Sequence, residues 1–335
     1  MYIIIPSYEP DQRLVDLVTE LKKQLSAANL LVVNDGSGPN YQEYFRDVAF
    51  QGATVLEHLT NKGKGAALKT AFKFIQQYGK QDVMITVDSD GQHLVPDIIR
   101  VAEATQEAPD TITLGSRSFV GKVPLRSRFG NHVTALLFRL VTGLHLTDTQ
   151  TGLRGLPTDL IPWLLALKGD RFEYEFNMLL EAKKAGYRIQ EVAIETIYLE
   201  DNKSSHFRPI KDSLRIYAPF LKFLGTALLA AMIDAVVLFI MMAWSNHLLL
   251  SVILARVLSA LTQCLLNANF VFHNTSHLFR TMIRYGILVV VILACNYVLM
   301  SSLLTVGIGL FLAKLVTETL LFLVSYRVQQ SHVFV

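Results

Sequence analysis

Cysteine is scarce in this chain of 335 residues, which has only Cys264 and Cys295. Both lie in apolar runs, so the sequence indicates neither a disulfide framework nor a metal–thiolate site. Two glycine-rich nucleotide signatures are also missing. No Ser or Thr follows a Gly-Lys at the Walker A spacing, and no G-x-G-x-x-G is present. The sequence therefore gives no reason to expect a P-loop or a dinucleotide site.

Charge is nearly absent from the last third of the chain. Of the 31 Lys and Arg and the 28 Asp and Glu, only six and two respectively follow Leu221. Residues 1–221 keep the others in near balance and have a globular composition, whereas the remainder is typical of a membrane protein. The net charge of +3 thus arises in the apolar part, and we expect no nucleic acid as a partner. No charged leader precedes the strand expected at Tyr2, which predicts that residues 1–221 stay in the cytoplasm.

Four long apolar segments follow, and each reaches the roughly 20 residues that span a bilayer. They are residues 223–244, 248–272, 283–306 and 308–326. Basic residues occur at Lys222, within 273–284 and at Arg327, whereas the connections 245–247 and 307 have none. Because Lys and Arg mark the cytoplasmic side, the sequence predicts four transmembrane helices with both termini in the cytoplasm.

Charged residues within or near these segments are Asp234, Arg256, Lys314 and Glu318. Charges inside a membrane are costly and usually face one another or a wet cavity. Lys314 and Glu318 have the i,i+4 spacing of a pair on one helix face. A structural ion pair is therefore at least as well supported as a role in transport.

Residues 1 to about 120 alternate between short apolar runs and helical patterns. The expected strands are 2–5, 30–33, 53–56, 83–87 and 111–114, and the expected helices are 12–25, 41–48, 65–78 and 96–105. This alternation is typical of an α/β fold, a mostly parallel sheet with helices on both faces. Ligands of such sheets bind at the carboxyl ends of the strands, where the polar clusters of this sequence fall.

The expected strand 83–87 ends in the sequence Asp88-Ser89-Asp90-Gly91. Two carboxylates one residue apart project to roughly the same side, and their repulsion would raise the pKa of one of them. A hard divalent cation removes this conflict, and Gln92 adds a third oxygen. The pattern predicts Mg²⁺ or Mn²⁺ bound by Asp88, Asp90 and Gln92. A solvated turn or a helix N-cap is the alternative.

A second polar cluster, residues 61–67, surrounds Lys64 with glycines at the start of an expected helix. Glycine permits close approach of the backbone, and a helix N-terminus favours anions. This cluster is a candidate phosphate contact.

The string from Asp88 to Pro96 resembles the D-x-D-x-Q-H-x-x-P signature of polyprenyl-phosphate sugar synthases, which are family 2 glycosyltransferases with a GT-A fold. Residues 5–9 resemble the family's opening I-P-x-Y-N-E, although the usual Asn is missing, and residues 32–37 resemble V-V-N-D-G-S. The resemblance implies catalytic roles for Asp88, Asp90 and Arg117. The donor-binding residues that it implies are Pro6, Tyr8, Glu9, Asp35, Lys64 and Asp88, with Asp35 accepting an N–H of the base.

The same resemblance extends to the acceptor side. Residues 115–117 resemble the family's G-S-R, and residues 148–154 resemble D-x-x-[ST]-G-[FL]-R. The implied acceptor-phosphate residues are Arg117, Arg128, Lys203 and Ser205. Arg117 could instead be an ordinary surface residue, and the polar loop 198–208 could be only a connection. An apolar helix at 133–141, which follows a basic turn, would lie either on the membrane surface or in the core.

The apolar part resembles a GtrA-like membrane domain, a duplicated hairpin of four helices. The similarity between its halves rests on residues 255–259 and 313–317, and on residues 270–272 and 332–334. Three regions follow from these patterns. They are a GT-A domain at 1–209, an interfacial amphipathic helix at 210–221 and a GtrA-like domain at 222–335.

The resemblance implies a metal-dependent, inverting hexosyltransferase at the cytoplasmic face of the cell membrane. Its donor would be a nucleotide diphosphate sugar of the GDP-mannose or UDP-glucose type, and its acceptor a polyprenyl phosphate in the bilayer. The membrane domain could also support a homo-oligomer. Two alternatives remain. One is transfer to a lipid or glycan hydroxyl with Glu173 or Glu175 as the base, and the other is a carrier or flippase for the lipid-linked sugar.

Overall fold

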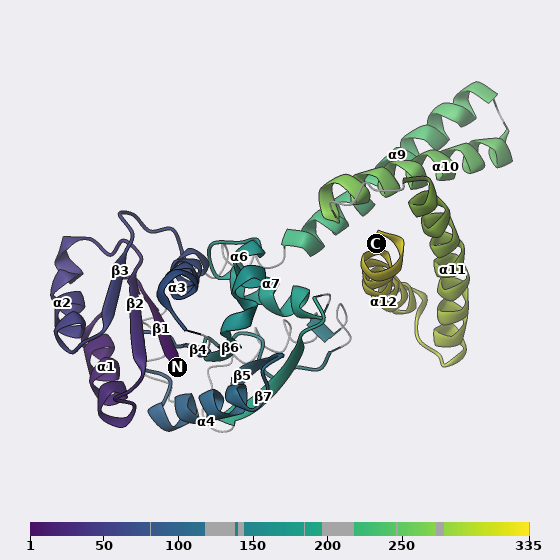
Figure 1. Cartoon of the computed structure of the whole chain (residues 1–335). Coiled ribbons are helices and arrows are strands. Elements are labelled where there is room, and N and C mark those ends of the chain that lie inside the picture. Colours follow the sequence, from purple (N-terminus) through teal and green to yellow (C-terminus); the bar gives the residue numbers. More distant parts are fainter. Residues whose placement is uncertain are drawn as a thin grey trace. The chain divides into compact units, whose positions relative to one another are not determined.

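Two compact units, Met1–Ile216 and Tyr217–Val335, make up the chain. The computed structural model describes residues 1–80, 82–117, 138–139, 144–183, 185–195, 218–245, 247–272 and 278–334 (Figure 1). The basic turn 123–130 and the loop 198–208 lie outside the described residues. The same is true of most of the helices expected at 133–141 and 210–221.

The first unit contains one seven-stranded sheet with the strand order β3-β2-β1-β4-β6-β5-β7. Its strands are β1 (Tyr2–Ser7), β2 (Asn29–Asn34), β3 (Thr54–Glu57), β4 (Val83–Thr86), β5 (Thr111–Arg117), β6 (Arg154–Pro157) and β7 (Arg188–Ile194). Strands β3, β2, β1 and β4 pair in parallel, as do β5 and β7, whereas β6 is antiparallel to both of its neighbours. The prediction of a mostly parallel sheet is confirmed, and β6 makes the sheet mixed.

Helices cover both faces of this sheet, as the alternation of elements predicted. They are α1 (Gln12–Gln24), α2 (Gln42–Phe50), α3 (Lys64–Tyr78), α4 (Val95–Gln106), α6 (Ile161–Ala166) and α7 (Glu173–Ala182), with short 3₁₀ turns at Pro39–Tyr41 and Thr158–Leu160. One core joins α1, α2 and α4 to alternate residues of the central strands, such as Ile3, Ile5 and Val32. Helix α3 packs on β1 and β2 and also contacts α6 and α7.

The polar ends of the parallel strands share one edge of the sheet. Strands β1, β2 and β4 run in the same direction, and β5 does too because β6 is antiparallel to both β4 and β5. The segments that follow β1, β2 and β4, together with the last residue of β5, Arg117, are thereby brought to this edge.

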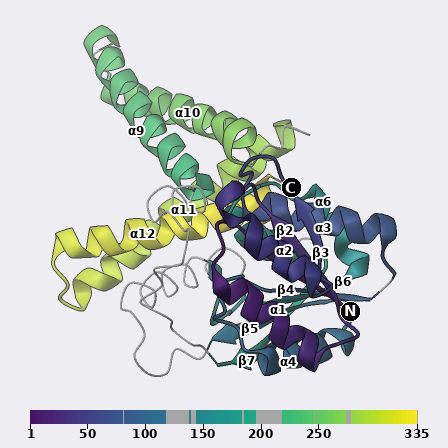
Figure 2. The same cartoon turned by 90° about the vertical axis from the view of Figure 1, so that its left-hand side faces the viewer.

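The second unit repeats one architecture twice. Helices α9 (Ala218–Ser245) and α11 (Leu278–Thr305) have 28 residues each, and α10 (Leu248–Leu266) and α12 (Leu310–Val328) have 19 each. Five-residue π-helical segments, Asn267–Val271 and Gln329–Val333, follow the two shorter helices. The two hairpins diverge from a common end in both views (Figures 1 and 2). The duplication predicted from weak sequence similarity is therefore present in the helices.

The two repeats meet through equivalent polar residues. Asn267 donates from Nδ2 to Oε1 of Gln329 at 2.8 Å, across a separation of 62 residues. The same spacing relates Phe272 to Phe334, as the sequence predicted, and these rings stack with centroids 4.8 Å apart. The expected equivalence of Ala255 with Ala313 is wrong by one helical turn. A spacing of 62 relates Ala255 to the buried Thr317, because the repeats align by their helix ends.

Four apolar helices form where four were expected, but four membrane spans are not confirmed. By length and composition three candidate spans are present among the described residues: Phe220–Ser245, Leu248–Val271 and Leu278–Thr305. Helix α12 is not among these candidate spans, because its 19 residues include three charged ones, Lys314, Glu318 and Arg327. The predicted pairing within it is confirmed, since Nζ of Lys314 lies 2.5 Å from Oε1 of Glu318.

Candidate active site

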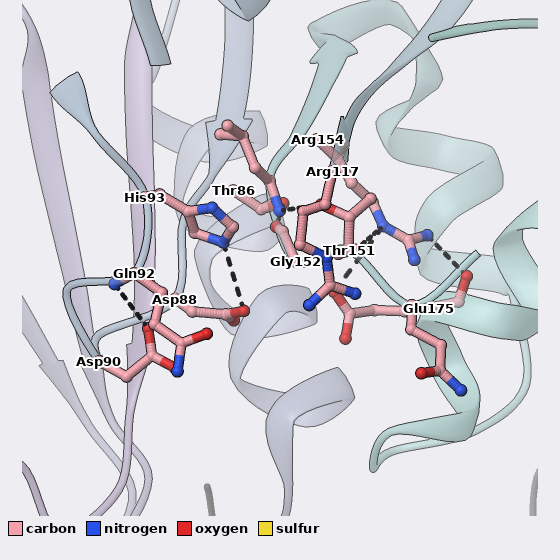
Figure 3. A network of polar contacts seen from close by, with 12 residues as sticks. Thr86, Asp88, Asp90, Gln92, His93, Arg117, Thr151, Gly152, Arg154 and Glu175 are labelled. Atoms are coloured by element: carbon pink, nitrogen blue, oxygen red, sulfur yellow. Dashed lines mark hydrogen bonds and ion pairs between the residues drawn. The ribbon is translucent and has the colours of Figure 1, made fainter. Parts of the chain in front are cut away.

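Asp88 is the centre of a charged network at the sheet edge (Figure 3). Its Oδ1 lies 2.6 Å from Nζ of Lys64, the first residue of α3, and its Oδ2 lies 3.5 Å from Nε2 of His93. Burial alone would raise the pKa of Asp88, but the charge of Lys64 and the hydrogen bond and charge of His93 hold it far below its ordinary value. Asp88 is therefore a carboxylate at neutral pH.

Lys64 joins this carboxylate to a second one on α7. Its ammonium lies 2.8 Å from Oε2 of Glu175 as well as 2.6 Å from Asp88, and its side chain is only 14% exposed. Burial by itself would lower the pKa of Lys64, yet the two carboxylates raise it above its usual value. The lysine is consequently a fixed cation between two acids.

Asp90 lies beside Asp88, but its pKa is shifted in the opposite direction. Its Oδ1 accepts the backbone N–H of Gln92 at 3.1 Å. Burial, followed by the charge of Asp88, raises the pKa of Asp90. The expectation that one carboxyl of this pair would have a raised pKa is confirmed.

This donor set fits a hard cation that shares its ligands with a substrate. A cation beside Asp90 would relieve the unfavourable charge next to Asp88, and Mg²⁺ is usually held by one or two carboxylates plus phosphates. Within the described ranges, no cluster of three or more His, Cys, Asp or Glu could hold a metal ion. Asp88, Asp90 and the amide oxygen of Gln92 remain the predicted protein ligands, and a bound substrate would supply further oxygens.

Gly152 lies directly against the Asp88 carboxylate. A Cβ at this position would be 2.1 Å from Oδ2 of Asp88, and the carbonyl of Gly152 accepts a 2.8 Å hydrogen bond from Thr86. Both the loop that contains Gly152 and the end of β4 are held in place, so neither can move away cheaply. Only glycine fits without displacing the carboxylate.

We therefore expect Gly152→Ala to displace Asp88 and to lower turnover by at least roughly tenfold. A displacement of about 1 Å in a reacting group can lower the rate about 100-fold. Gly286→Ala on α11 is the control, since nothing lies within 4 Å of its Cβ. Steady-state kinetics on both variants measures the effect. Equal activities would show that Asp88 tolerates displacement.

Arg117 is held by a buried acid in the loop before β6. Its Nε lies 2.5 Å from Oδ2 of Asp148 and its Nη2 lies 3.0 Å from Oδ1, and the Asp148 side chain is fully buried. This two-bond arrangement fixes the plane of the guanidinium group at the end of β5. Arg117 is thus an anchored cation and differs from a mobile surface arginine.

Asp35 is buried and organises the loop that leads to Lys64. Its carboxylate accepts the backbone N–H groups of Lys62 and Gly63 at 2.9 and 2.7 Å and lies 2.7 Å from Nδ1 of His58. Asp35 therefore holds the backbone just before α3. Its predicted contact with a nucleotide base remains a prediction.

The other predicted donor residues surround the end of β1. Pro6 lies within β1 opposite Val33, and Tyr8 and Glu9 follow the strand. Glu9 has a positive φ of 49° and donates its backbone N–H to Oγ of Ser37 at 2.9 Å. The segments after β1 and β2 are thereby tied together.

The structure thus brings Asp88, Asp90, Lys64 and Arg117 to one edge, while the predicted Arg128, Lys203 and Ser205 lie outside the described residues. His58, Asp148 and Arg154 were not predicted as site residues from the sequence. Asp148 and Arg154 are the first and last residues of the D-x-x-[ST]-G-[FL]-R pattern, which could have identified them. His58 follows β3 and has no comparable signal.

Two family models match this chain. Residues 2–157 match the model described as glycosyl transferase family 2, and residues 222–334 match the model described as the GtrA/DPMS transmembrane domain. The first match lies within the first unit of the structure, and the second lies within the second unit.

Three curated proteins are similar to this chain over about three fifths of its length. An uncharacterized protein of Methanocaldococcus jannaschii is 31% identical over 209 residues, which are 61% of this chain and 84% of that protein. The UDP-N-acetylglucosamine–dolichyl-phosphate N-acetylglucosaminyltransferase of Methanococcus voltae is 29% identical over 219 residues, 60% and 86% of the two chains. The undecaprenyl-phosphate mannosyltransferase of Micrococcus luteus is 27% identical over 209 residues, 60% and 85%.

Proposed function

Because the chain belongs to glycosyl transferase family 2 and contains a GtrA/DPMS transmembrane domain, we propose that it transfers a hexose from a nucleotide diphosphate sugar to a polyprenyl phosphate. Two of these relatives have named activities with different sugars, but each name specifies a phosphorylated polyprenol-type acceptor, dolichyl or undecaprenyl phosphate. This agreement supports the acceptor class and leaves the sugar open between GDP-mannose and UDP-glucose types.

The observation that carries the proposal is the pair of fixed cations at one sheet edge. Lys64, held by Asp88 and Glu175, would bind the donor diphosphate, and Arg117, held by Asp148, would bind the acceptor phosphate. Arginine suits this role because its planar group can bind phosphate through two N–H bonds. Two anionic substrates would then meet between cations. The single displacement with inversion is part of the proposal and rests on the family resemblance.

Asp88, Asp90 and Gln92 would hold Mg²⁺ or Mn²⁺, which would offset the charge that develops on the leaving diphosphate. Lys64 and Arg117 would stabilise charge in the same step from fixed positions, so the site need not reorganise during the reaction. His93 contributes by keeping the Asp88 carboxylate oriented.

A hydroxyl acceptor would require a positioned base, and one carboxylate oxygen of each candidate acid already has partners. Glu175 contacts Lys64 at 2.8 Å. Glu173 accepts the backbone N–H groups of Asp170 and Arg171 at 3.2 and 3.3 Å through Oε1. A phosphate monoester has a second pKa of about 6 and is mostly dianionic at neutral pH, so it needs no base.

The proposal is tested by mass spectrometry of lipids made by purified protein from a panel of UDP- and GDP-sugars. Polyprenyl phosphate and the matching polyprenol are offered as competing acceptors. We expect one hexose to appear on the phosphate. A product formed on the hydroxyl, or no transfer from any donor, would contradict the proposed function.

The membrane arrangement is a separate proposal, namely that both termini and residues 1–221 lie in the cytoplasm. A cysteine introduced at Ser276 should be labelled from the cytoplasmic side, and one at Asn246 from the opposite side, in a background without Cys264 and Cys295. The distribution of basic residues is the physical reason. The reverse labelling pattern would exclude a cytosolic nucleotide sugar as donor.

A further inference from the structure

Glu175 has an unusual environment for a buried carboxylate. Its Oε2 lies 2.8 Å from Nζ of Lys64, while its Oε1 is buried and has no hydrogen-bond partner among the described residues. The nearest cation to Oε1 is Nε of the buried Arg154, at 3.8 Å. Oε2 of Glu173 on the same helix is likewise buried without a hydrogen-bond partner among the described residues. What distinguishes Glu175 is its contact with the ammonium of Lys64.

We propose that Glu175 is a positioning residue for the donor, because it fixes the ammonium of Lys64 so that its third N–H faces the diphosphate. The inference rests on the proposed function of this site. An ammonium has three N–H donors. In the described part of the chain, Lys64 has two partners, Asp88 and Glu175, which leaves one donor for a ligand.

The backbones that carry these two residues are locked together. Ala66 of α3 donates its N–H to the carbonyl of Asp170 at 2.8 Å, just before α7 begins. A Cβ at Gly65 would lie 2.5 Å from Cβ of Tyr174, so the two helices touch at this point. Lys64 and Glu175 are the immediate neighbours of these contacts and therefore keep a fixed separation.

Arg154 explains how two carboxylates can flank a single ammonium. Its guanidinium donates to the carbonyl of Glu175 at 2.6 Å and to that of Thr151 at 3.0 Å. This buried positive charge offsets the second carboxylate and ties α7 to the loop that contains Gly152. Arg154 thus holds Glu175 in place, and Glu175 in turn orients the ammonium of Lys64.

The direction in which Glu175→Gln changes donor affinity distinguishes a positioning role from a purely electrostatic one. If Glu175 acted only through its negative charge, it would repel the donor diphosphate, and Glu175→Gln would tighten binding. A positioning role predicts the opposite, since the amide holds the ammonium less firmly. We expect the Kd for the nucleotide diphosphate and the KM for the donor to rise about tenfold, the loss of roughly one charge-assisted hydrogen bond, with kcat changed less than about threefold.

The experiment is calorimetric titration of the full-length protein with UDP and with GDP, each with Mn²⁺, together with donor kinetics and thermal melting. The variants are Glu175→Gln, Lys64→Ala and the double mutant. Glu173→Gln is the matched control, because Glu173 lies on the same helix and its Oε1 accepts the backbone N–H groups of Asp170 and Arg171. This change should alter neither Kd nor KM. In the Lys64→Ala background, Glu175→Gln should have no further effect on Kd.

Two results would overturn the inference while leaving the proposed function intact. One is nucleotide binding by Glu175→Gln that equals or exceeds that of the parent protein. The other is an additive effect in the double mutant, since Glu175 would then not act through Lys64. If the parent protein binds neither nucleotide and transfers no sugar, the proposed function fails first, and the inference fails with it.

Discussion

Asp90→Asn should reduce glycosyl transfer by at least about 100-fold and leave the fold intact. Asp90 is the carboxyl of the pair whose pKa is raised by burial and by Asp88, so its ionised form is the one that a divalent cation would stabilise. An amide keeps the shape of the side chain but removes the charge that attracts the metal. Initial rates of lipid-sugar formation measure the loss, and a melting curve measures the fold.

Asp16→Asn on α1 is the control for this change. Asp16 is exposed, and its Oδ1 accepts a hydrogen bond from Gln12 at 3.1 Å. Excess chelator should abolish activity of the parent protein, and added Mg²⁺ or Mn²⁺ should restore it. Full activity in chelator, or an Asp90→Asn variant as fast as Asp16→Asn, would remove the metal from the mechanism.

The strands β1, β2 and β4 could be predicted because the pattern that identifies them lies within each strand's own sequence. Buried parallel strands are continuous apolar runs, and β1, β2 and β4 appear in the sequence as such runs followed by polar turns. Strands β6 and β7 were not predicted. The four residues of β6 include Gly155 and Pro157, and β7 is a half-exposed strand that begins with Arg188. Tertiary pairing, and not local preference, makes these two segments strands.

The acidic part of the site was predictable for a similar reason. Asp88 and Asp90 follow a strand directly, so the strand itself determines where they point. The environment of Lys64 was not predictable, because its partner Glu175 is far away in sequence and reaches it only through the contact of α3 with α7. Asp148 likewise meets Arg117 only because β5 and the loop before β6 are adjacent.

In the apolar unit, the periodic sequence led to an alignment of the two repeats that is wrong by one helical turn. Small residues recur every four positions at Ser251, Ala255 and Ser259 in α10 and at Ala313 and Thr317 in α12, so more than one alignment of the two halves fits. The buried set Ser251, Ala255 and Ser259 corresponds to Ala313, Thr317 and Leu321 only when the helix ends are matched. The contact between Asn267 and Gln329 resolves this ambiguity.

Arg117 is the residue on which the acceptor class depends most strongly, and Arg117→Ala should abolish transfer to polyprenyl phosphate. The same change leaves Asp148 fully buried without its guanidinium partner. Removal of one member of a buried ion pair costs about 3–5 kcal/mol, so lost activity alone would not prove a role in phosphate binding. Binding and stability therefore have to be separated.

Arg117→Lys makes that separation, because it keeps a positive charge near Asp148 but cannot form two parallel bonds to a phosphate. We expect this variant to melt close to the parent protein, to bind UDP or GDP normally and to recover only part of the transfer, with its KM raised for polyprenyl phosphate and not for the donor. Asp148→Asn should lower transfer in the same way, since Arg117 loses the partner that orients it. If Arg117→Lys instead raises only the donor KM, or if the parent protein glycosylates a polyprenol and ignores its phosphate, Arg117 does not bind the acceptor phosphate and the hydroxyl-acceptor mechanism takes its place.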